Sequence, residues 1–262
     1  MNLDLTGKTA LVCGSTQGIG KASALELASM GASVVLIARD EEKLRSVLKE
    51  LDSSKNQKHN YIVADFSNTT EVKTNAIAFI AKNGPIHILV NNTGGPAAGA
   101  IVDAKPEEFL ATFNNHLINN HNLAQAVLDG MKTSGYGRII NIISTSVKLP
   151  LPNLGVSNTI RAAVANWSKT MANEVGKFGI TVNNVLPGAT NTGRLQQIAA
   201  NKSQKTGAKV EDIFDHMAAE VPMGRIGEPH EVAAAVGFLA SPAAAYINGI
   251  NLPVDGGRTG NL

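Results

Sequence analysis

Short runs of Val, Ile and Leu alternate with longer segments of helical periodicity along nearly the whole chain. Runs that are apolar at every position are typical of parallel strands that helices cover on both faces. The predicted strands are residues 9–13, 33–38, 60–64, 86–91, 137–144, 180–186 and 250–253. The predicted helices lie near residues 19–30, 41–51, 69–82, 106–131, 156–177 and 229–239. The alternation predicts an α/β fold, a doubly wound parallel sheet of about seven strands with helices on both faces.

The sequence predicts one domain over residues 1–262, with a small helical insertion at about 193–221. No proline-rich, serine-rich or single-sign charged stretch divides the chain. A net charge of +2 and an aromatic content of 4% argue against a nucleic-acid-binding protein, which usually carries clustered Lys and Arg beside stacking rings. The chain shows no signal-peptide pattern and no apolar run that could cross a bilayer, so we expect a cytoplasmic protein that does not bind membranes. The single cysteine, Cys13, excludes an internal disulfide.

A glycine-lined turn follows the first predicted strand. Gly14, Gly18 and Gly20 lie where residues 9–13 lead into the next predicted helix. Glycine lets the backbone turn tightly and approach a diphosphate, and the N-terminus of a helix favours the negative charge of that group. Ligands of doubly wound sheets bind beyond the carboxyl ends of the strands, where the strand order reverses. The turn therefore predicts a dinucleotide-binding site at this edge of the sheet.

The spacing Gly-x-x-x-Gly-x-Gly resembles the corresponding turn of the short-chain dehydrogenase/reductase family, and later segments resemble that family in the same order. Asp65 stands where the family contacts adenine, and residues 91–94, Asn-Asn-Thr-Gly, are similar to its Asn-Asn-Ala-Gly turn. Residues 187–192 resemble its Pro-Gly-x-x-x-Thr segment, whose threonine holds the nicotinamide carboxamide. Residues 222–229 and 254–257 look like the classical branch that includes 3-oxoacyl-(acyl-carrier-protein) reductases. The resemblance covers nearly the whole chain and implies a Rossmann-type sheet, a nicotinamide cofactor and a small-molecule substrate.

The identity of the cofactor depends on Ala38 and Arg39, which follow the second predicted strand. An acidic side chain at this place binds a free ribose 2′-hydroxyl, whereas a guanidinium favours a 2′-phosphate, so Arg39 predicts NADP rather than NAD. Asp40 could weaken that contact, and a solvated loop charge is the alternative for Arg39. The predicted cofactor-binding residues are Gly14, Ser15, Gln17, Gly18, Ile19, Gly20, Arg39, Asp65, Phe66, Asn92, Gly94, Arg161, Pro187, Gly188, Thr190 and Thr192.

The catalytic positions of the family are altered in this chain. The family uses a serine to polarise the substrate carbonyl, a tyrosine to donate a proton, and a lysine one helical turn later to lower the pKa of that tyrosine. Ser144 stands at the serine position, and the segment that begins at Arg161 matches the lysine position, which places Ser157 at the tyrosine position. Ser157 and Arg161 share one face of a predicted helix. An aliphatic hydroxyl is a much weaker acid than a phenol, and arginine stays charged, so the usual proton donor is missing.

His116 stands where the family carries an asparagine that supports a water relay. A histidine that faces the site could act as a general acid, and a hydrogen-bonded helix histidine is the alternative. His116 and His121 fall on different faces of a helix, and we expect no metal site. The predicted catalytic residues are Ser144, Ser157, Arg161 and His116.

Three functions fit these residues. The first is an NADP-dependent oxidoreductase, acting on a carbonyl or an alcohol, that takes its proton from water or His116. The second is a catalytically silent NAD(P)-binding protein with a regulatory or scaffolding role. The third is non-redox chemistry on a substrate carboxylate held by Arg161. The resemblance further implies a homo-oligomer, a dimer or tetramer that pairs through residues 106–131 and 156–177. The insertion at residues 193–221 is a candidate lid over the substrate, and an ordinary surface hairpin is the alternative.

Overall fold

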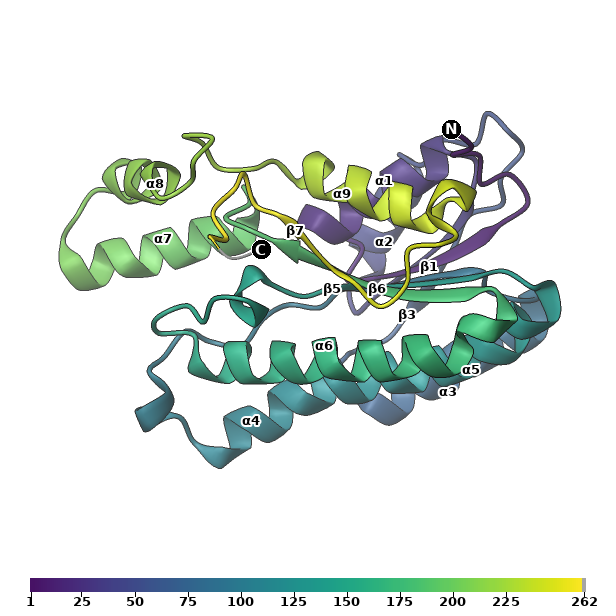
Figure 1. Ribbon diagram of the computed structural model, residues 1–262, viewed down its shortest axis with the longest axis horizontal. Helices are drawn as coiled ribbons and strands as arrows, with labels where there is room; N and C mark the ends of the chain where they lie inside the picture. The colour runs from purple at the N-terminus through teal and green to yellow at the C-terminus, as the bar shows by residue number, and fades with distance from the viewer. Residues whose placement is uncertain (261–262) are drawn as a thin grey trace.

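A computed structural model describes residues 1–260, excepting the side chain at position 205. Its centre is one parallel sheet in the strand order β3-β2-β1-β4-β5-β6-β7 (Figure 1). The order reverses between β1 and β4, so the predicted doubly wound α/β fold is confirmed. The strands are β1 (Thr9–Cys13), β2 (Ser33–Ala38), β3 (Asn60–Val63), β4 (Ile88–Asn91), β5 (Gly137–Ile142), β6 (Ile180–Pro187) and β7 (Asn251–Val254).

Helices cover the sheet on both faces (Figure 1). The upper layer in that view consists of α1 (Gly18–Ser29), α2 (Glu41–Leu48) and α9 (Pro229–Ala240). The lower layer consists of α3 (Thr69–Asn83), α5 (Asn119–Ser134) and α6 (Gly155–Val175). Short 3-10 turns connect some of these elements, at Ile101–Asp103, Thr145–Val147, Gly176–Phe178 and Pro242–Ala244.

The uninterrupted apolar runs have a simple structural reason, which β1 illustrates. Ala10 and Val12 belong to the hydrophobic cluster that includes α1 and α9. Leu11 and Cys13, the residues between and after them, belong to the cluster on the opposite face, with α3, α5 and α6. Successive side chains of a strand point to opposite faces, so a strand with both faces covered needs apolar residues throughout.

The prediction of a single α-helix over residues 106–131 is wrong in the middle of that range. The chain forms α4 (Pro106–Phe113), a π-helical segment (Asn114–Ile118) and then α5. A π turn holds one residue more than an α turn, and it changes which side chains face the sheet. The pattern of apolar residues carries no signal for that wider turn, which buries His116.

The insertion after β6 forms two helices, α7 (Gly193–Thr206) and α8 (Val210–Ala219), which extend beyond the end of the sheet (Figure 1). Thr192 begins α7 as its cap, because its hydroxyl accepts a hydrogen bond from the backbone N–H of Leu195 at 3.3 Å. Over residues 1–260, no helix is both long enough and apolar enough to span a membrane.

Candidate active site

A cavity of about 610 Å³ lies at the carboxyl edge of the sheet. The loops that follow β1, β2, β3, β4, β5 and β6 all contribute to its lining. The cavity therefore lies at the reversal of strand order between β1 and β4, the place where sheets of this kind bind their ligands.

The glycine turn after β1 is built by close contacts that only glycine permits. Gly14 and Gly18 have φ angles of +57° and +54°, in the left-handed region that disfavours other residues. A Cβ added to Gly20, at the start of α1, would lie 2.2 Å from the carbonyl oxygen of Gly14. The backbone of the turn therefore folds directly onto the first turn of α1, whose free N–H groups can receive a phosphate.

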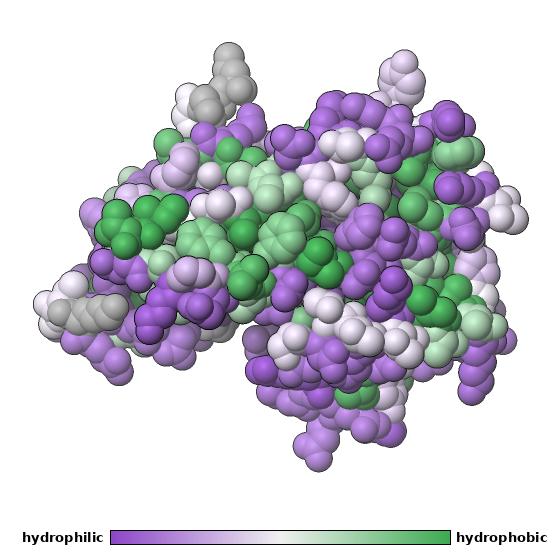
Figure 2. Space-filling model, turned by 90° about the horizontal axis from the view of Figure 1, so that it is seen from below, coloured by the Kyte–Doolittle hydropathy of each residue, from purple (hydrophilic) through white to green (hydrophobic). Residues whose placement is uncertain are grey.

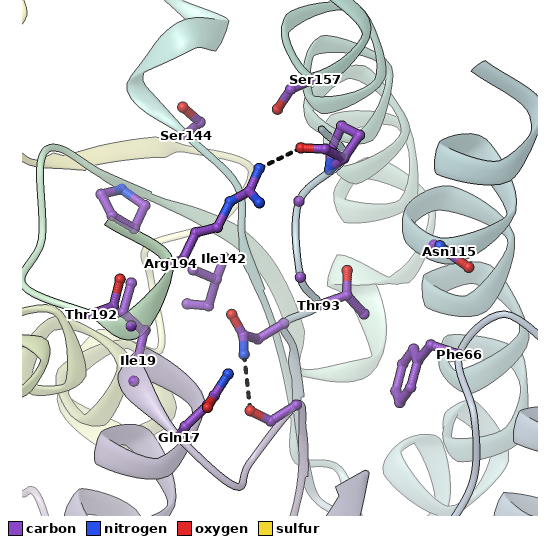
Figure 3. A pocket seen from close by; sticks show the side chains of 18 of the residues that line it. Gln17, Ile19, Phe66, Thr93, Asn115, Ile142, Ser144, Ser157, Thr192 and Arg194 are labelled. Carbon is purple, nitrogen blue, oxygen red and sulfur yellow. Dashed lines mark hydrogen bonds between the residues drawn. The ribbon is translucent and has the colours of Figure 1, made fainter. Parts of the chain in front are cut away.

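Asn92 ties the glycine turn to the loop after β4. Its Nδ2 donates hydrogen bonds to the carbonyl oxygens of Cys13 and Gly14, at 3.3 Å and 3.4 Å. Asn92 and Gln17 both line the cavity, and Figure 3 shows Gln17 at the bottom of the view. Asn92 thus links the two loops on either side of the strand-order reversal, the place where a dinucleotide binds in sheets of this kind.

Most of the predicted cofactor-binding residues line this cavity. Ser15 and Gly20 do not, since both are buried behind the turn. The hydroxyl of Ser15 has no hydrogen-bond partner among the described residues. The predicted residues that line the cavity are Gly14, Gln17, Gly18, Ile19, Arg39, Asp65, Phe66, Asn92, Gly94, Arg161, Pro187, Gly188, Thr190 and Thr192.

The loops after β2 and β3 form one end of the cavity. Arg39 lies there with an exposed side chain and without an ion pair to any described carboxylate. Asp40 is turned toward α2, where its carboxylate accepts from the N–H of Lys43 at 3.1 Å and pairs with the ammonium of Lys43. Hydrogen bonds from Ser67, and then the charge of Arg39, lower the pKa of Asp65. Arg39 is therefore left free to meet an anionic ligand group.

Ser144, Ser157 and Arg161 come together at the other end of the cavity, and each is half-buried. The Ser144 oxygen accepts a hydrogen bond from the N–H of Ser146 at 3.1 Å, which leaves its own O–H free to donate. Ser157 forms no hydrogen bond with the described residues, and Figure 3 shows Ser144 and Ser157 both at the top of the view. Arg161 donates from Nη1 to the carbonyl oxygen of Ile142 at 2.8 Å.

His116 is brought near the cavity but does not line it. Its Nδ1 lies 2.6 Å from the hydroxyl oxygen of Thr93, which does line the cavity. Burial, and then the positive charge of Arg161, lower the pKa of His116 well below its ordinary value. The imidazole is therefore neutral at pH 7 and stands behind Thr93.

Arg194 is a functional candidate that sequence reasoning missed. It lies in the first turn of α7, lines the cavity and donates from Nη2 to the carbonyl oxygen of Pro96, a bond that Figure 3 draws as a dashed line. The only signal in the sequence is its place two residues after Thr192. Thr93 and Asn115 line the cavity as well and were likewise not predicted.

All three tyrosines of the chain lie elsewhere. The hydroxyl of Tyr61 donates to Glu41, and that of Tyr136 donates to the carbonyl oxygen of Ala240. Tyr246 is fully exposed. Within residues 1–260, no group of three His, Cys, Asp or Glu side chains is arranged to hold a metal ion.

Comparison with known proteins places this arrangement in a family. Residues 14–259 match the model of the enoyl-(acyl carrier protein) reductase family. The chain is 38% identical to 3-oxoacyl-(acyl-carrier-protein) reductase FabG of Vibrio cholerae over 97% of its own length and 98% of that protein. The chain belongs to the short-chain dehydrogenase/reductase family. The coarser prediction, an NAD(P)-dependent oxidoreductase of this family, is thereby confirmed.

Solved structures of the same family superpose closely on this one. L-sorbose reductase from Gluconobacter frateurii, in a complex with NADPH and L-sorbose, has a TM-score of 0.94 and 30% identity, over 100% of both chains. Gluconate 5-dehydrogenase from Burkholderia cenocepacia, in a complex with NADP and tartrate, has a TM-score of 0.88 and 31% identity, over 100% of this chain and 98% of its own. The predicted cofactor, NADP, agrees with both complexes.

Proposed function

We propose that this short-chain dehydrogenase/reductase is an NADP-dependent oxidoreductase that reduces a carbonyl of a small molecule, or oxidises the corresponding alcohol, without a catalytic tyrosine. One observation carries the proposal: a single cavity joins the glycine turn to Ser144, Ser157 and Arg161. The alternative cofactor, NAD, is disfavoured by Arg39, which forms no ion pair with any described carboxylate and can meet a 2′-phosphate.

Different residues of the cavity would bind the cofactor and act on the substrate. The turn at Gly14 and Gly18 would hold the diphosphate, Arg39 the 2′-phosphate, and Thr192 the nicotinamide carboxamide. The bound cofactor supplies or accepts a hydride. Ser144 has a free O–H and would donate it to the substrate oxygen as negative charge develops there.

The proton for that oxygen would come from water. His116 is a neutral, buried group that holds Thr93 in place, so we assign it a positioning role. Ser157 is too weak an acid to replace a phenol, and its unpaired hydroxyl is free to hold a water molecule beside the substrate. Arg161 remains charged at neutral pH even though removal from bulk water, and then the charge of Arg194, lower its pKa to about 10.

The absence of any tyrosine from the cavity lining favours a second candidate, a silent NADP-binding protein. The test titrates the protein with NADPH and NADH by fluorescence and follows NADPH absorbance with ketones, 3-oxoacyl thioesters and alcohols. Turnover of any of them supports the enzyme. Tight NADPH binding without turnover supports the silent protein, and no binding of either nucleotide contradicts both.

The double variant Ser157→Tyr with Arg161→Lys sharpens this choice. Restoring a phenol beside an ammonium should raise ketone reduction, if the missing proton donor alone limits the rate. Each single variant serves as the matched control, because neither restores the pair. A folded double variant that binds NADPH and still reduces no ketone would show that more than the donor has changed.

We further propose that two copies of the chain associate through the face formed by α4, α5 and α6. Figure 2 shows that face, over which apolar side chains gather between polar ones. Leu110 of α4 is 63% exposed and would be covered in such a pair. Light scattering should give a mass of at least two chains, and Leu110→Glu should shift it toward one. In the same proposal, the helices α7 and α8, which form the insertion after β6, would cover the bound substrate.

A further inference from the structure

The two ends of the cavity differ in charge. Arg39 and Asp65 lie at the end formed by the loops after β2 and β3. Arg161 and Arg194 lie at the end that holds Ser144 and Ser157. Among the described lining residues, no carboxylate accompanies this second pair of cations. The end where chemistry would occur is therefore uniformly positive.

Arg161 has more donor groups than the protein uses. A guanidinium carries five N–H donors, and only Nη1 has a described acceptor, the carbonyl of Ile142. No described Asp or Glu forms an ion pair with Arg161. A half-buried cation without a counter-ion costs free energy, so its remaining donors call for an acceptor that the ligand brings.

Arg194 approaches the same point from the other wall. A Cβ added to Gly95 would lie 3.7 Å from Nη2 of Arg161 and 3.9 Å from Nη2 of Arg194. Both guanidinium groups thus flank one glycine, whose missing side chain leaves the space between them open. In Figure 3 the side chain of Arg194 crosses the cavity, with Ser144 and Ser157 on one side of it. Like charges brought this close are stabilised by an anion between them.

The charged groups of the cofactor do not account for the positive charge of Arg161 and Arg194. Its diphosphate is provided for at the glycine turn, its 2′-phosphate at Arg39, and its ribose is neutral. Resting on the proposed function, we propose that the substrate is an oxo acid whose carboxylate is held between Arg161 and Arg194, with its carbonyl oxygen at Ser144. Planar guanidinium groups match a carboxylate with two parallel hydrogen bonds each, which also fixes the orientation of the carbonyl.

The test measures carboxylate binding and selectivity on the full chain. Calorimetry with malonate is performed on the protein saturated with NADP⁺, and NADPH oxidation is compared for acetoacetate and methyl acetoacetate. Arg194→Gln is the test variant. Lys202→Gln is the matched control, since it removes one positive charge from an exposed position of the same helix outside the cavity.

Arg194→Gln should weaken malonate binding about 10- to 100-fold, the loss of one charge-assisted contact, and leave NADPH affinity unchanged. Lys202→Gln should change neither. No malonate binding by the wild type, or equal weakening in both variants, would overturn the carboxylate site. Weaker NADPH binding in Arg194→Gln would also overturn it, because Arg194 would then serve the cofactor.

The substrate pair separates this inference from the proposed function. Reduction of the acid in preference to the ester, with the preference lost in Arg194→Gln, supports both. Equal reduction of acid and ester keeps the oxidoreductase and removes the carboxylate site. Malonate binding that depends on Arg194, without reduction of either compound or turnover of any member of the panel above, keeps the carboxylate site and removes the oxidoreductase.

Discussion

Gly20→Ala tests whether the turn after β1 holds the cofactor. The added Cβ would lie 2.2 Å from the Gly14 carbonyl oxygen and 2.7 Å from Nδ2 of Asn92. Nonbonded atoms stay about 3.5 Å apart, so the Gly14 peptide must recede by about 1 Å. Overpacking of this kind costs about 1–3 kcal/mol of stability. Displaced N–H groups also lose contacts to the diphosphate, each worth about 1.5–3 kcal/mol, so the NADPH Kd should rise about 100-fold.

Fluorescence titration with NADPH measures that loss, and urea unfolding measures the accompanying change in stability. The control is Gly99→Ala, at an exposed position outside the cavity where an added Cβ meets no atom within 4 Å. It should leave both quantities unchanged. If folded Gly20→Ala protein bound NADPH within about threefold of wild type, a shift of about 0.7 kcal/mol, the diphosphate would not lie against this turn.

Two further changes test the charges around the cavity. Arg39→Asp should raise the NADPH Kd about 10- to 100-fold and lower that of NADH, as titration with both nucleotides measures; an unchanged ratio would contradict the 2′-phosphate contact. His116→Asn tests a pH effect. Because burial first, and Arg161 second, lower the pKa of His116, the folded protein excludes a proton that the unfolded chain binds below about pH 6.5. Wild-type stability should fall as the pH drops from 7 to 5, and urea midpoints should fall less in the variant; equal slopes would contradict a neutral His116.

The fold was predictable because its signals are local. Apolar runs such as Ala10–Cys13 mark strands that must satisfy two hydrophobic faces at once, and glycines such as Gly31 and Gly179 end helices in left-handed conformations. The π-helical segment Asn114–Ile118, in which His116 is buried, was not predictable, because the local pattern of apolar residues does not distinguish a π turn from an α turn.

The candidate site divides in the same way. The place of Ser144, Ser157 and Arg161 in the cavity could be predicted because the segments that carry them resemble segments of the family. Arg194 could not be predicted, because its relation to Arg161 depends on how α7 folds back over the loop at Gly95. The neutral state of His116 depends first on burial and second on the charge of Arg161, which is far from it along the chain, and sequence spacing reports neither.

If the proposed function holds, the missing tyrosine and the two arginines of the cavity, Arg161 and Arg194, are connected. A tyrosine stabilises a developing oxyanion by giving it a proton, which requires a pKa near that of the oxygen it serves. The two guanidinium groups of Arg161 and Arg194 exceed the single charge of a bound carboxylate by one positive charge, which can stabilise the neighbouring oxyanion without any proton transfer in a partly desolvated cavity. Proton transfer from water can then follow hydride transfer instead of accompanying it. The rate should consequently show no ionisation between pH 6 and 8 that belongs to a protein acid, whereas an enzyme that relied on a side-chain acid titrating in this range would lose activity as that acid lost its proton.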